Sequence, residues 1–351
     1  MSITAQDVVD ALRVIEDPDL HRDIVTLGFV QTPEISDGVV SVRIVLTTPA
    51  CPVRDQMQRD AEAAIAALPG VREARVTMEA NVRQHTAAGG TPVEGVRNII
   101  AVASNKGGVG KSTVSANLAV ALARLGARVG LLDADITGPN IPTMMGVAQG
   151  AQAQGERGLG IEERYGVKVC SIGFVLPKGT PVVWRGPMIG TAVRQLLHDI
   201  KWSELDYLLI DLPPGTSDAS MSMAQEAPIS GVVVVSTPQD VALEDAAKAV
   251  AMFDKLNVPV FGIIENMSYF ICPHCNERTE IFGHGGARQA AEDLGLEFLG
   301  ELPLDPATRA AADAGEPVVH SAPESPQAAA FLDVARQVAA RCSVLEYAAG
   351  A

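Results

Sequence analysis

The chain has 351 residues, and its 42 acidic and 27 basic side chains leave a formal net charge of −15. An acidic chain without a Lys/Arg cluster repels nucleic acid, so we expect no nucleic-acid partner. The sequence has neither a run of 18 apolar residues nor the basic-then-apolar start of a signal peptide, and its five cysteines do not suggest a disulfide framework. We therefore expect a cytoplasmic protein that does not bind membranes.

Residues 1–83 are predicted to form a small α/β domain. Thr4 stands where a helix N-cap is expected, directly before apolar residues at helical spacing. Alternating apolar residues at 40–46 predict a half-buried strand, residues 53–68 predict a second helix, and residues 71–78 predict a final strand.

Residues 84–96 are polar and contain glycine and proline, so they are predicted to be a linker to a second domain at 97–351. In that domain apolar segments alternate with helical ones. Their continuous hydrophobicity is typical of a mostly parallel sheet covered on both faces, an α/β fold that binds ligands at the C-terminal ends of its strands. Strands are expected at 98–103, 129–133, 167–171, 207–211, 231–236, 260–265 and 298–302.

The most informative segment is S-N-K-G-G-V-G-K-S-T at 104–113, which follows an apolar strand and precedes a helix. This context is that of a phosphate-binding loop, in which glycines let backbone N–H groups surround a phosphate at the positive end of the helix. Lys111 is expected to reach the β- and γ-phosphates, and the Ser112 hydroxyl is expected to bind Mg²⁺. The predicted nucleotide-binding residues of the loop are Gly107, Gly108, Val109, Gly110, Lys111, Ser112 and Thr113.

Two residues distinguish this loop from the standard pattern. Asn105 replaces a glycine, and we expect asparagine to be tolerated there because it accepts a left-handed backbone better than most residues. Lys106 is an additional lysine, and with it the loop resembles the deviant Walker A ATPases, which include MinD, ParA, nitrogenase iron protein and the Mrp-type (ApbC-like) iron–sulfur carriers. The resemblance implies ATP as the nucleotide and a homodimer in which Lys106 reaches the partner's ATP, so that hydrolysis depends on dimerisation. From composition alone, Lys106 is equally well explained as a solvated surface lysine.

Carboxylates follow two of the predicted strands. Asp133 and Asp135 end the strand at 129–133, and such a pair is suited to holding a Mg²⁺-bound water and orienting the attacking water, although both residues also fit a capped turn. The resemblance gives the catalytic role to Asp135. Asp211 ends another apolar strand and fits a Walker B carboxylate beside Mg²⁺, and the P-P-G at 213–215 fits a switch that senses the γ-phosphate.

Recognition of the base is assigned through the resemblance, which makes Asn266 the adenine contact. An ordinary asparagine turn at the end of a strand explains Asn266 equally well. The proline-containing stretch at 302–306 is expected to close the base pocket.

Cys272 and Cys275 form a C-x-x-C pair in an irregular stretch after Asn266. Tetrahedral Zn²⁺ and [4Fe–4S] clusters each need four ligands, and two copies of the pair across a twofold axis would supply four thiolates. Zinc completed within one subunit by His274 or His284 is the alternative, and a redox dithiol is a third interpretation. Chemistry alone leaves cluster and zinc open.

Longer stretches extend the resemblance to Mrp-type carriers over nearly the whole chain. They are the residues 264–270 before the C-x-x-C pair, the I-F-G-H-G-G at 281–286, and, in the first domain, 17–20, 27–30 and 46–52, which resemble a small domain of iron–sulfur assembly factors. The resemblance implies a slow ATPase that binds a cluster of the [4Fe–4S] type at a dimer interface through Cys272 and Cys275 and transfers it to apo-proteins. Cys51 precedes a helix, where a thiolate is stabilised, so it is either reactive or a packing residue.

Two other functions are compatible with parts of the sequence. A positioning ATPase of the ParA or MinD kind would need a basic patch or a basic amphipathic helix, and the C-terminal helix at 331–341 is only weakly basic. A nucleotide switch stabilised by zinc would keep the loop but carry no cluster.

Overall fold

A computed structural model describes residues 3–85, 91–135, 138–147, 160–174, 186–215 and 218–349 of the chain. Residues 86–90 of the predicted linker and the two residues after Asp135 lie outside these ranges. The chain divides into two compact units, one formed by Met1–Arg83 with Ala339–Ala351 and the other by Gln84–Val338.

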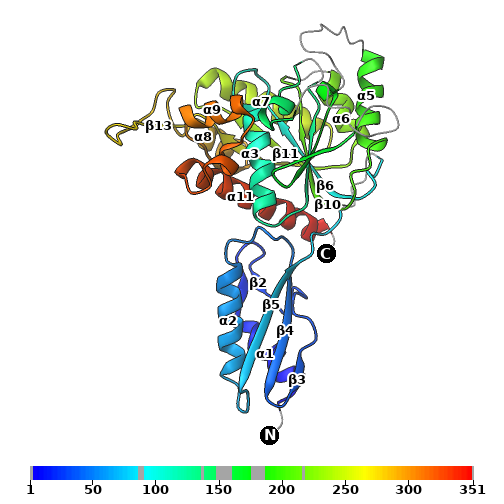
Figure 1. The fold of residues 1–351 in the computed structure, drawn as a ribbon, viewed down its shortest axis with the longest axis vertical. Coiled ribbons are helices and arrows are strands. Elements are labelled where there is room, and N and C mark those ends of the chain that lie inside the picture. Colours follow the sequence, from blue (N-terminus) through cyan, green and yellow to red (C-terminus); the bar gives the residue numbers. More distant parts are fainter. Residues whose placement is uncertain are drawn as a thin grey trace. The chain divides into compact units, whose positions relative to one another are not determined.

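The first unit is a three-stranded sheet packed against two helices (Figure 1). Thr4 forms a capping box with Asp7 at the start of the first helix, as its position in the sequence predicts. The predicted helix at 53–68 and the two predicted strands are also confirmed. The elements are α1 (Ala5–Ala11), η1 (Leu12–Val14), β1 (Glu16–Asp17), β2 (Arg22–Asp23), β3 (Glu34–Ser36), β4 (Val39–Leu46), α2 (Arg54–Ala66) and β5 (Glu73–Ala80).

The end of the last helix, α11 (Pro326–Ala349), groups with this first unit, whereas the sequence places it with the second domain. Tyr347 packs against the apolar core of the first unit. The hydroxyl of Ser343 donates a hydrogen bond to that of Thr47 at 2.5 Å.

The second unit contains an eight-stranded sheet with the strand order β15-β12-β11-β6-β10-β7-β9-β8 (Figure 1). All neighbouring strands are parallel except β8, which runs antiparallel to β9 at one edge. The seven expected strands and the α/β fold are confirmed. The strand β8 was missed because its sequence, Glu-Glu-Arg, has no apolar pattern. The sheet strands are β6 (Val96–Ala103), β7 (Val129–Asp133), β8 (Glu162–Arg164), β9 (Val167–Ser171), β10 (Leu205–Asp211), β11 (Ile229–Ser236), β12 (Val260–Glu265) and β15 (Glu297–Glu301).

Helices connect these strands, and a short hairpin follows β12. The hairpin strands are β13 (Phe270–Ile271) and β14 (Arg278–Thr279). The helical segments are α3 (Lys111–Arg124), α4 (Ile141–Met144), η2 (Ile172–Phe174), α5 (Gly186–His198), α6 (Asp218–Glu226), α7 (Asp240–Lys255), α8 (Gly286–Asp293), α9 (Pro306–Ala314), α10 (Val318–Ser321) and α11. None of the described helices is both long enough and apolar enough to cross a membrane.

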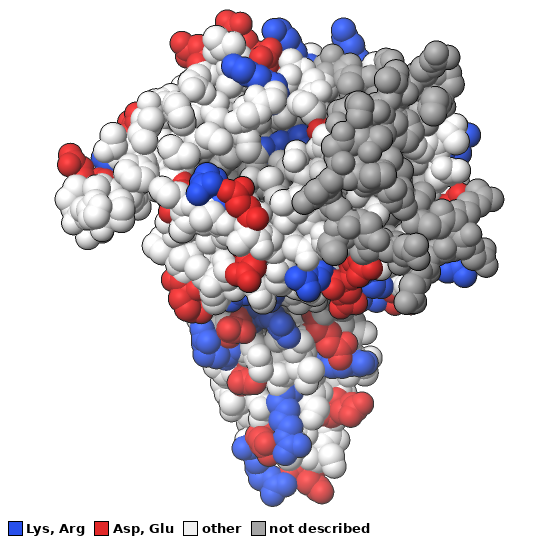
Figure 2. Space-filling model, turned by 45° about the horizontal axis from the view of Figure 1, so that its top comes forward, with Lys and Arg blue, Asp and Glu red and all other residues white. Residues whose placement is uncertain are grey.

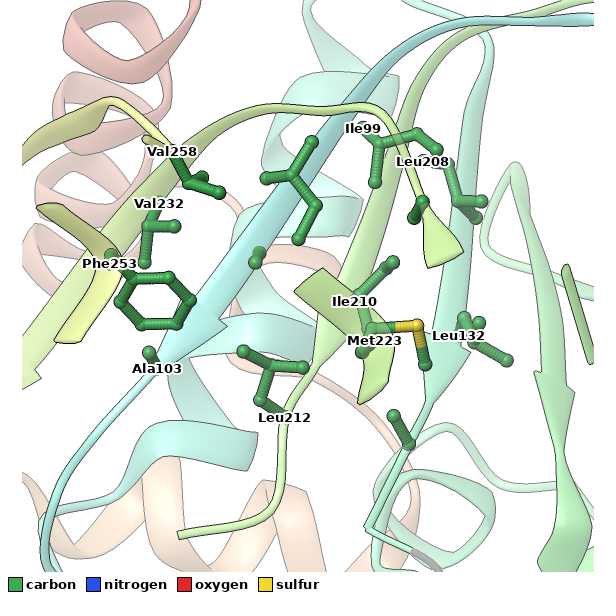
Figure 3. Packing of buried hydrophobic residues seen from close by; sticks show 14 of the residues in the cluster. Ile99, Ala103, Leu132, Leu208, Ile210, Leu212, Met223, Val232, Phe253 and Val258 are labelled. Carbon is green, nitrogen blue, oxygen red and sulfur yellow. The ribbon is translucent and has the colours of Figure 1, made fainter. Parts of the chain in front are cut away.

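One apolar core lies between the sheet and the helices α5 to α8. Ile99 and Ala103 of β6 point into it together with Phe253 of α7, which is fully buried (Figure 3). Successive strand residues face opposite sides, so the remaining residues of β6 face α3, which packs on the other side of the sheet. Covering both faces explains why the strands read as continuous apolar runs. The C-terminal ends of β6, β7, β10 and β12 carry the polar residues of the site.

Candidate functional site

The predicted phosphate loop surrounds a cavity of about 260 Å³ at the C-terminal end of β6. All seven predicted loop residues line it, and so do Lys106 and Asp135. Ser104, Asn140, Met144 and Pro214 complete the described part of the lining. The loop, the additional lysine and the predicted catalytic carboxylate therefore face one space.

The backbone of the loop is shaped for an anion. Gly110 has φ = 82°, and a Cβ atom at this position would lie 2.3 Å from Nδ2 of Asn266, so only glycine fits. The helix α3 starts at the next residue, and its N-cap is Gly110 itself, which has no side chain to cap the helix. Its first N–H groups are therefore available to a phosphate, which also gains from the helix dipole.

Asn105 does not replace glycine in the way expected from the sequence. It is absent from the described non-glycine residues with positive φ, so a left-handed backbone is not what the position requires. Its side-chain Nδ2 instead donates a hydrogen bond to Oδ1 of Asp245 in α7 at 3.3 Å. The amide therefore attaches the start of the loop to a neighbouring helix.

Asp211 at the end of β10 is the centre of a buried polar cluster. Its Oδ1 accepts a 2.6 Å hydrogen bond from Nζ of Lys111, and its Oδ2 accepts one of 2.6 Å from Oγ of Ser112. Asp211 is fully buried and Lys111 is 6% exposed, so each compensates the charge of the other. A carboxylate, a hydroxyl and an ammonium in this arrangement suit Mg²⁺ and phosphate oxygens.

Ser115 belongs to the same cluster, although the sequence analysis did not select it. Its Oγ lies 2.6 Å from Oδ1 of Asp211 and 3.1 Å from the carbonyl oxygen of Lys111, one helical turn earlier. The sequence signal for this contact was a serine in the first turns of an apolar helix, because a hydroxyl buried there needs a hydrogen-bond partner.

The structure separates the two carboxylates after β7. Asp133 is fully buried: its Oδ1 accepts from the backbone N–H of Asp135, and its Oδ2 accepts from the N–H of Ile141 and the hydroxyl of Ser171. Burial raises the pKa of Asp133 well above its ordinary value, and the nearby carboxylate of Asp211 adds to the rise. Asp133 therefore organises the loop after β7, whereas Asp135 lines the cavity.

The Pro-Pro-Gly segment after β10 touches the phosphate loop directly. The backbone N–H of Gly215 donates to the carbonyl oxygen of Ser104 at 2.8 Å, and Pro214 lines the cavity. The two segments are therefore in direct contact beside the cavity.

Asn266 lies beneath the loop and is 7% exposed. Its Nδ2 donates a 2.8 Å hydrogen bond to the carbonyl oxygen of Val109. Neither Asn266 nor the stretch at 302–306 is among the described residues that line the cavity. The adenine contact thus stays a prediction, while the hydrogen bond to the loop is a role that the sequence did not indicate.

Cys272 and Cys275 lie in the turn between β13 and β14, on a hairpin that extends from the body of the second unit (Figure 1). The backbone N–H of Cys272 donates to the carbonyl of Glu277, and that of Asn276 donates to the carbonyl of Cys272. Backbone N–H groups of His274 and then Cys275, together with the Cys275 side chain, lower the pKa of the Cys272 thiol. A thiolate held in this way suits a metal or an iron–sulfur cluster.

The described part of the chain supplies no further ligand beside the two thiols. In this part the only group of three or more His, Cys, Asp or Glu ligand atoms lying within 4.8 Å of one another is formed by Glu265, His284 and Glu301. His284 Nε2 lies 2.6 Å from Oε2 of Glu301, and the group to which His284 belongs contains neither cysteine. One subunit thus offers two of the four ligands that such a centre needs.

Cys51 is not activated by the helix that follows it. Burial raises the pKa of this thiol to about 11, and the carboxylates of Asp17 and Asp19 add to the rise against a hydrogen bond from the backbone N–H of Val53. The thiol packs against the core of the first unit. The packing interpretation is therefore favoured over the reactive one.

Comparisons with known proteins agree with this site. The family model of the NUBPL iron-transfer P-loop NTPases matches residues 95–339, and that of the iron–sulfur cluster assembly proteins matches residues 5–78. A protein of Deinococcus radiodurans named an iron–sulfur cluster carrier protein is 48% identical over 335 residues, covering 95% of this chain and 94% of that protein. A Synechocystis protein of the same name is 44% identical, covering 97% of this chain and 99% of the relative.

Two solved structures share the fold of the second unit. A nucleotide-binding protein from Archaeoglobus fulgidus, solved in complex with ADP, is 44% identical with a TM-score of 0.56, covering 63% of this chain and 88% of that one. The cell division ATPase MinD of Pyrococcus furiosus is 26% identical with a TM-score of 0.52, covering 69% of this chain and 98% of that one. With the loop, the carboxylates and the matched models in agreement, this chain belongs to the NUBPL family of iron-transfer P-loop NTPases.

Proposed function

We propose that this protein is an ATP-dependent iron–sulfur cluster carrier, which binds a cluster between two subunits and transfers it to apo-proteins. The observation that carries the proposal is the incomplete ligand set at the hairpin: two adjacent thiols, one of them with a lowered pKa, without a third described ligand. The same chain holds a phosphate loop with its carboxylates. The names of the Deinococcus and Synechocystis relatives support the same activity.

The residues around the cavity have separate roles in ATP hydrolysis. ATP and Mg²⁺ are the substrate, and Mg²⁺ supplies charge compensation on the phosphates. Ser112 and Asp211 offer oxygen ligands for the metal, and Lys111 leaves Asp211 to contact the phosphates. Asp135 faces the cavity and orients the attacking water. Hydrolysis is slow and depends on dimerisation through Lys106.

Two exposed features support a homodimer. Lys106 is exposed at the mouth of the cavity, where its ammonium can reach a second subunit. Large apolar side chains on and after the hairpin are also exposed, namely Ile271 (41%), Ile281 (51%) and Phe282 (36%). Large exposed apolar side chains are typical of a surface that becomes buried in an interface. Two hairpins meeting there complete four thiolates.

The charge distribution favours protein clients over nucleic acid. On the face shown in Figure 2, Lys and Arg side chains of the described residues are interspersed with Asp and Glu instead of forming one basic surface. In α11, the guanidinium of Arg336 is paired with Asp333 at 2.7 Å. These features argue against the ParA- or MinD-like alternative, which needs a basic surface or helix.

Anaerobic cluster reconstitution tests the proposal. Wild type is expected to hold about four irons per dimer with broad absorption near ~400 nm, and the Cys272→Ala/Cys275→Ala variant to hold none. Cys51→Ala is the matched control, because it removes a cysteine outside the hairpin. If the protein is colourless and holds about one zinc per monomer, the carrier function is contradicted and a zinc-stabilised nucleotide switch takes its place.

Transfer is measured separately from binding. The reconstituted protein is mixed with an apo-enzyme that needs a [4Fe–4S] cluster, with and without ATP and Mg²⁺, under a chelator that removes free iron. Recovery of enzyme activity that depends on Cys272 and Cys275 supports a carrier. If ATP leaves the recovery of enzyme activity unchanged, the protein transfers clusters but nucleotide does not control the transfer.

A further inference from the structure

The end of β12 connects the phosphate loop with the cysteine hairpin. Glu265 and Asn266 are consecutive residues, and both are buried. Asn266 contacts the phosphate loop through the hydrogen bond to the carbonyl oxygen of Val109. Glu265 contacts the helix α8 and the turn that leads to the hairpin. A movement at one contact is therefore passed to the other through a single peptide unit of the central sheet.

Glu265 is a fully buried carboxylate whose oxygens are both hydrogen-bonded. Its Oε2 accepts from the backbone N–H of Ala287 at 2.7 Å, and its Oε1 accepts from the N–H of Gly285 at 2.9 Å. These N–H groups lie at the N-cap and in the first turn of α8, whose N-cap residue, Gly285, has no side chain to cap the helix. Glu265 thus caps α8 from a different element and gains from the positive end of the helix.

The network continues from Glu265 to the hairpin. The hydroxyl of Ser268 donates to Oε1 of Glu265 at 2.6 Å and lies 3.4 Å from Oε2 of Glu301. Glu301 in turn lies 3.6 Å from the guanidinium of Arg278 in β14, the second strand of the hairpin. The guanidinium stacks on the ring of Tyr269 at 4.1 Å, at the base of the same hairpin.

The alternative, a divalent-metal site made by Glu265, His284 and Glu301, is disfavoured by the same contacts. Glu265 already accepts three hydrogen bonds, and its position at a helix N-terminus stabilises negative charge without a metal. The guanidinium of Arg278 beside Glu301 would repel a cation. Hydrogen bonding and ion pairing therefore account for the cluster.

We propose that Glu265 is a positioning residue that couples the nucleotide loop to the Cys272–Cys275 hairpin, with Glu301 as the outer link. The role of the hairpin in holding a cluster rests on the proposed function, but the coupling itself needs no cluster. A nucleotide that orders the loop orders Asn266, and Glu265 then holds α8 and the hairpin base in one arrangement. Without Glu265, the loop and the hairpin move independently.

Amide hydrogen exchange of the full-length, cluster-free protein tests the coupling. Exchange in the peptide covering residues 270–279 is compared without nucleotide and with saturating ADP and Mg²⁺. ADP is used because a dimer that needs the γ-phosphate would itself cover the hairpin. In wild type, ADP is expected to slow exchange in this peptide about threefold or more. In Glu265→Gln and Glu301→Gln, the ADP-dependent difference is expected to disappear while ADP still binds.

The matched control is Glu292→Gln, which removes the same charge from an exposed position of α8 and keeps the ADP effect. Glu301 is 29% exposed, so its variant remains informative if Glu265→Gln destabilises the fold. A purely structural role would raise exchange equally with and without ADP and overturn the proposal. So would an absent ADP effect in wild type that binds ADP. Failure of cluster binding would leave this result unchanged, because no cluster is present.

Discussion

Ser115 and Asp211 are 96 positions apart in the chain, yet Oγ of Ser115 lies 2.6 Å from Oδ1 of Asp211. Parallel pairing of β10 with β6 brings the carboxylate beside the helix that follows the phosphate loop. The hydroxyl holds the carboxylate that we propose as a ligand of Mg²⁺. The buried polar cluster therefore extends two residues beyond the loop motif at 104–113.

Replacing Ser115 by alanine is expected to raise the Mg²⁺ concentration at the midpoint of ATP hydrolysis about tenfold or more. A hydrogen bond to a charged group is worth about 1.5–3 kcal/mol, and 1.4 kcal/mol corresponds to a factor of ten. The measurement is steady-state hydrolysis over a Mg²⁺ titration. Ser115→Thr keeps the hydroxyl and should restore the wild-type midpoint. Equal midpoints for the alanine variant and wild type would contradict this role.

Asn substitutions at Asp135 and Asp133 are expected to have different effects. Asp135→Asn should lower kcat by about 10²–10⁴ and leave nucleotide affinity and stability nearly unchanged, because the carboxylate faces the cavity. Asp133→Asn should cost about 1–3 kcal/mol of unfolding free energy, because its new NH₂ group faces N–H or O–H donors. Urea unfolding and single-turnover hydrolysis of both variants measure the difference. The assignment fails if the two variants exchange these effects.

Hydrolysis should depend on protein concentration through Lys106. In wild type, the rate per subunit is expected to rise with concentration until dimers dominate. In Lys106→Ala the rate should stay low at every concentration while ADP affinity is retained. Lys248→Ala is a suitable control, since Lys248 is another exposed lysine near the loop, paired with Asp245 at 3.0 Å. A concentration-independent rate in wild type would argue for catalysis within one subunit.

Stability is expected to fall at alkaline pH in part through Cys51. The pKa of its thiol is raised from the ordinary value of 9.0 to about 11, so the folded state keeps the proton that the unfolded state releases. The unfolding free energy should therefore decline as the pH rises from 9.0 to about 11. Cys51→Ala should make this decline shallower than in wild type, as measured by urea unfolding at several pH values. Parallel pH profiles would show that Cys51 makes no contribution.

The sequence by itself determined the phosphate loop, the seven parallel strands and the C-x-x-C pair. Each of these depends on residues that are close together in the chain, and local spacing determines both hydrophobic period and loop chemistry. The same local reasoning left Asp133 and Asp135 equivalent, because two acids in one turn have the same immediate neighbours. It also placed Cys51 beside a helix terminus, but it did not indicate that the carboxylates of Asp17 and Asp19 oppose ionisation of this thiol.

Only the tertiary structure decided which of these groups face the cavity and which are buried. Burial of Asp133, the cap that Glu265 provides to α8, and the hydroxyl of Ser115 on Asp211 all join residues from different strands and helices. Such contacts depend on sheet order and on long-range packing. The free energy of a buried charge is set by the partners that the folded chain brings to it, and no local pattern specifies those partners.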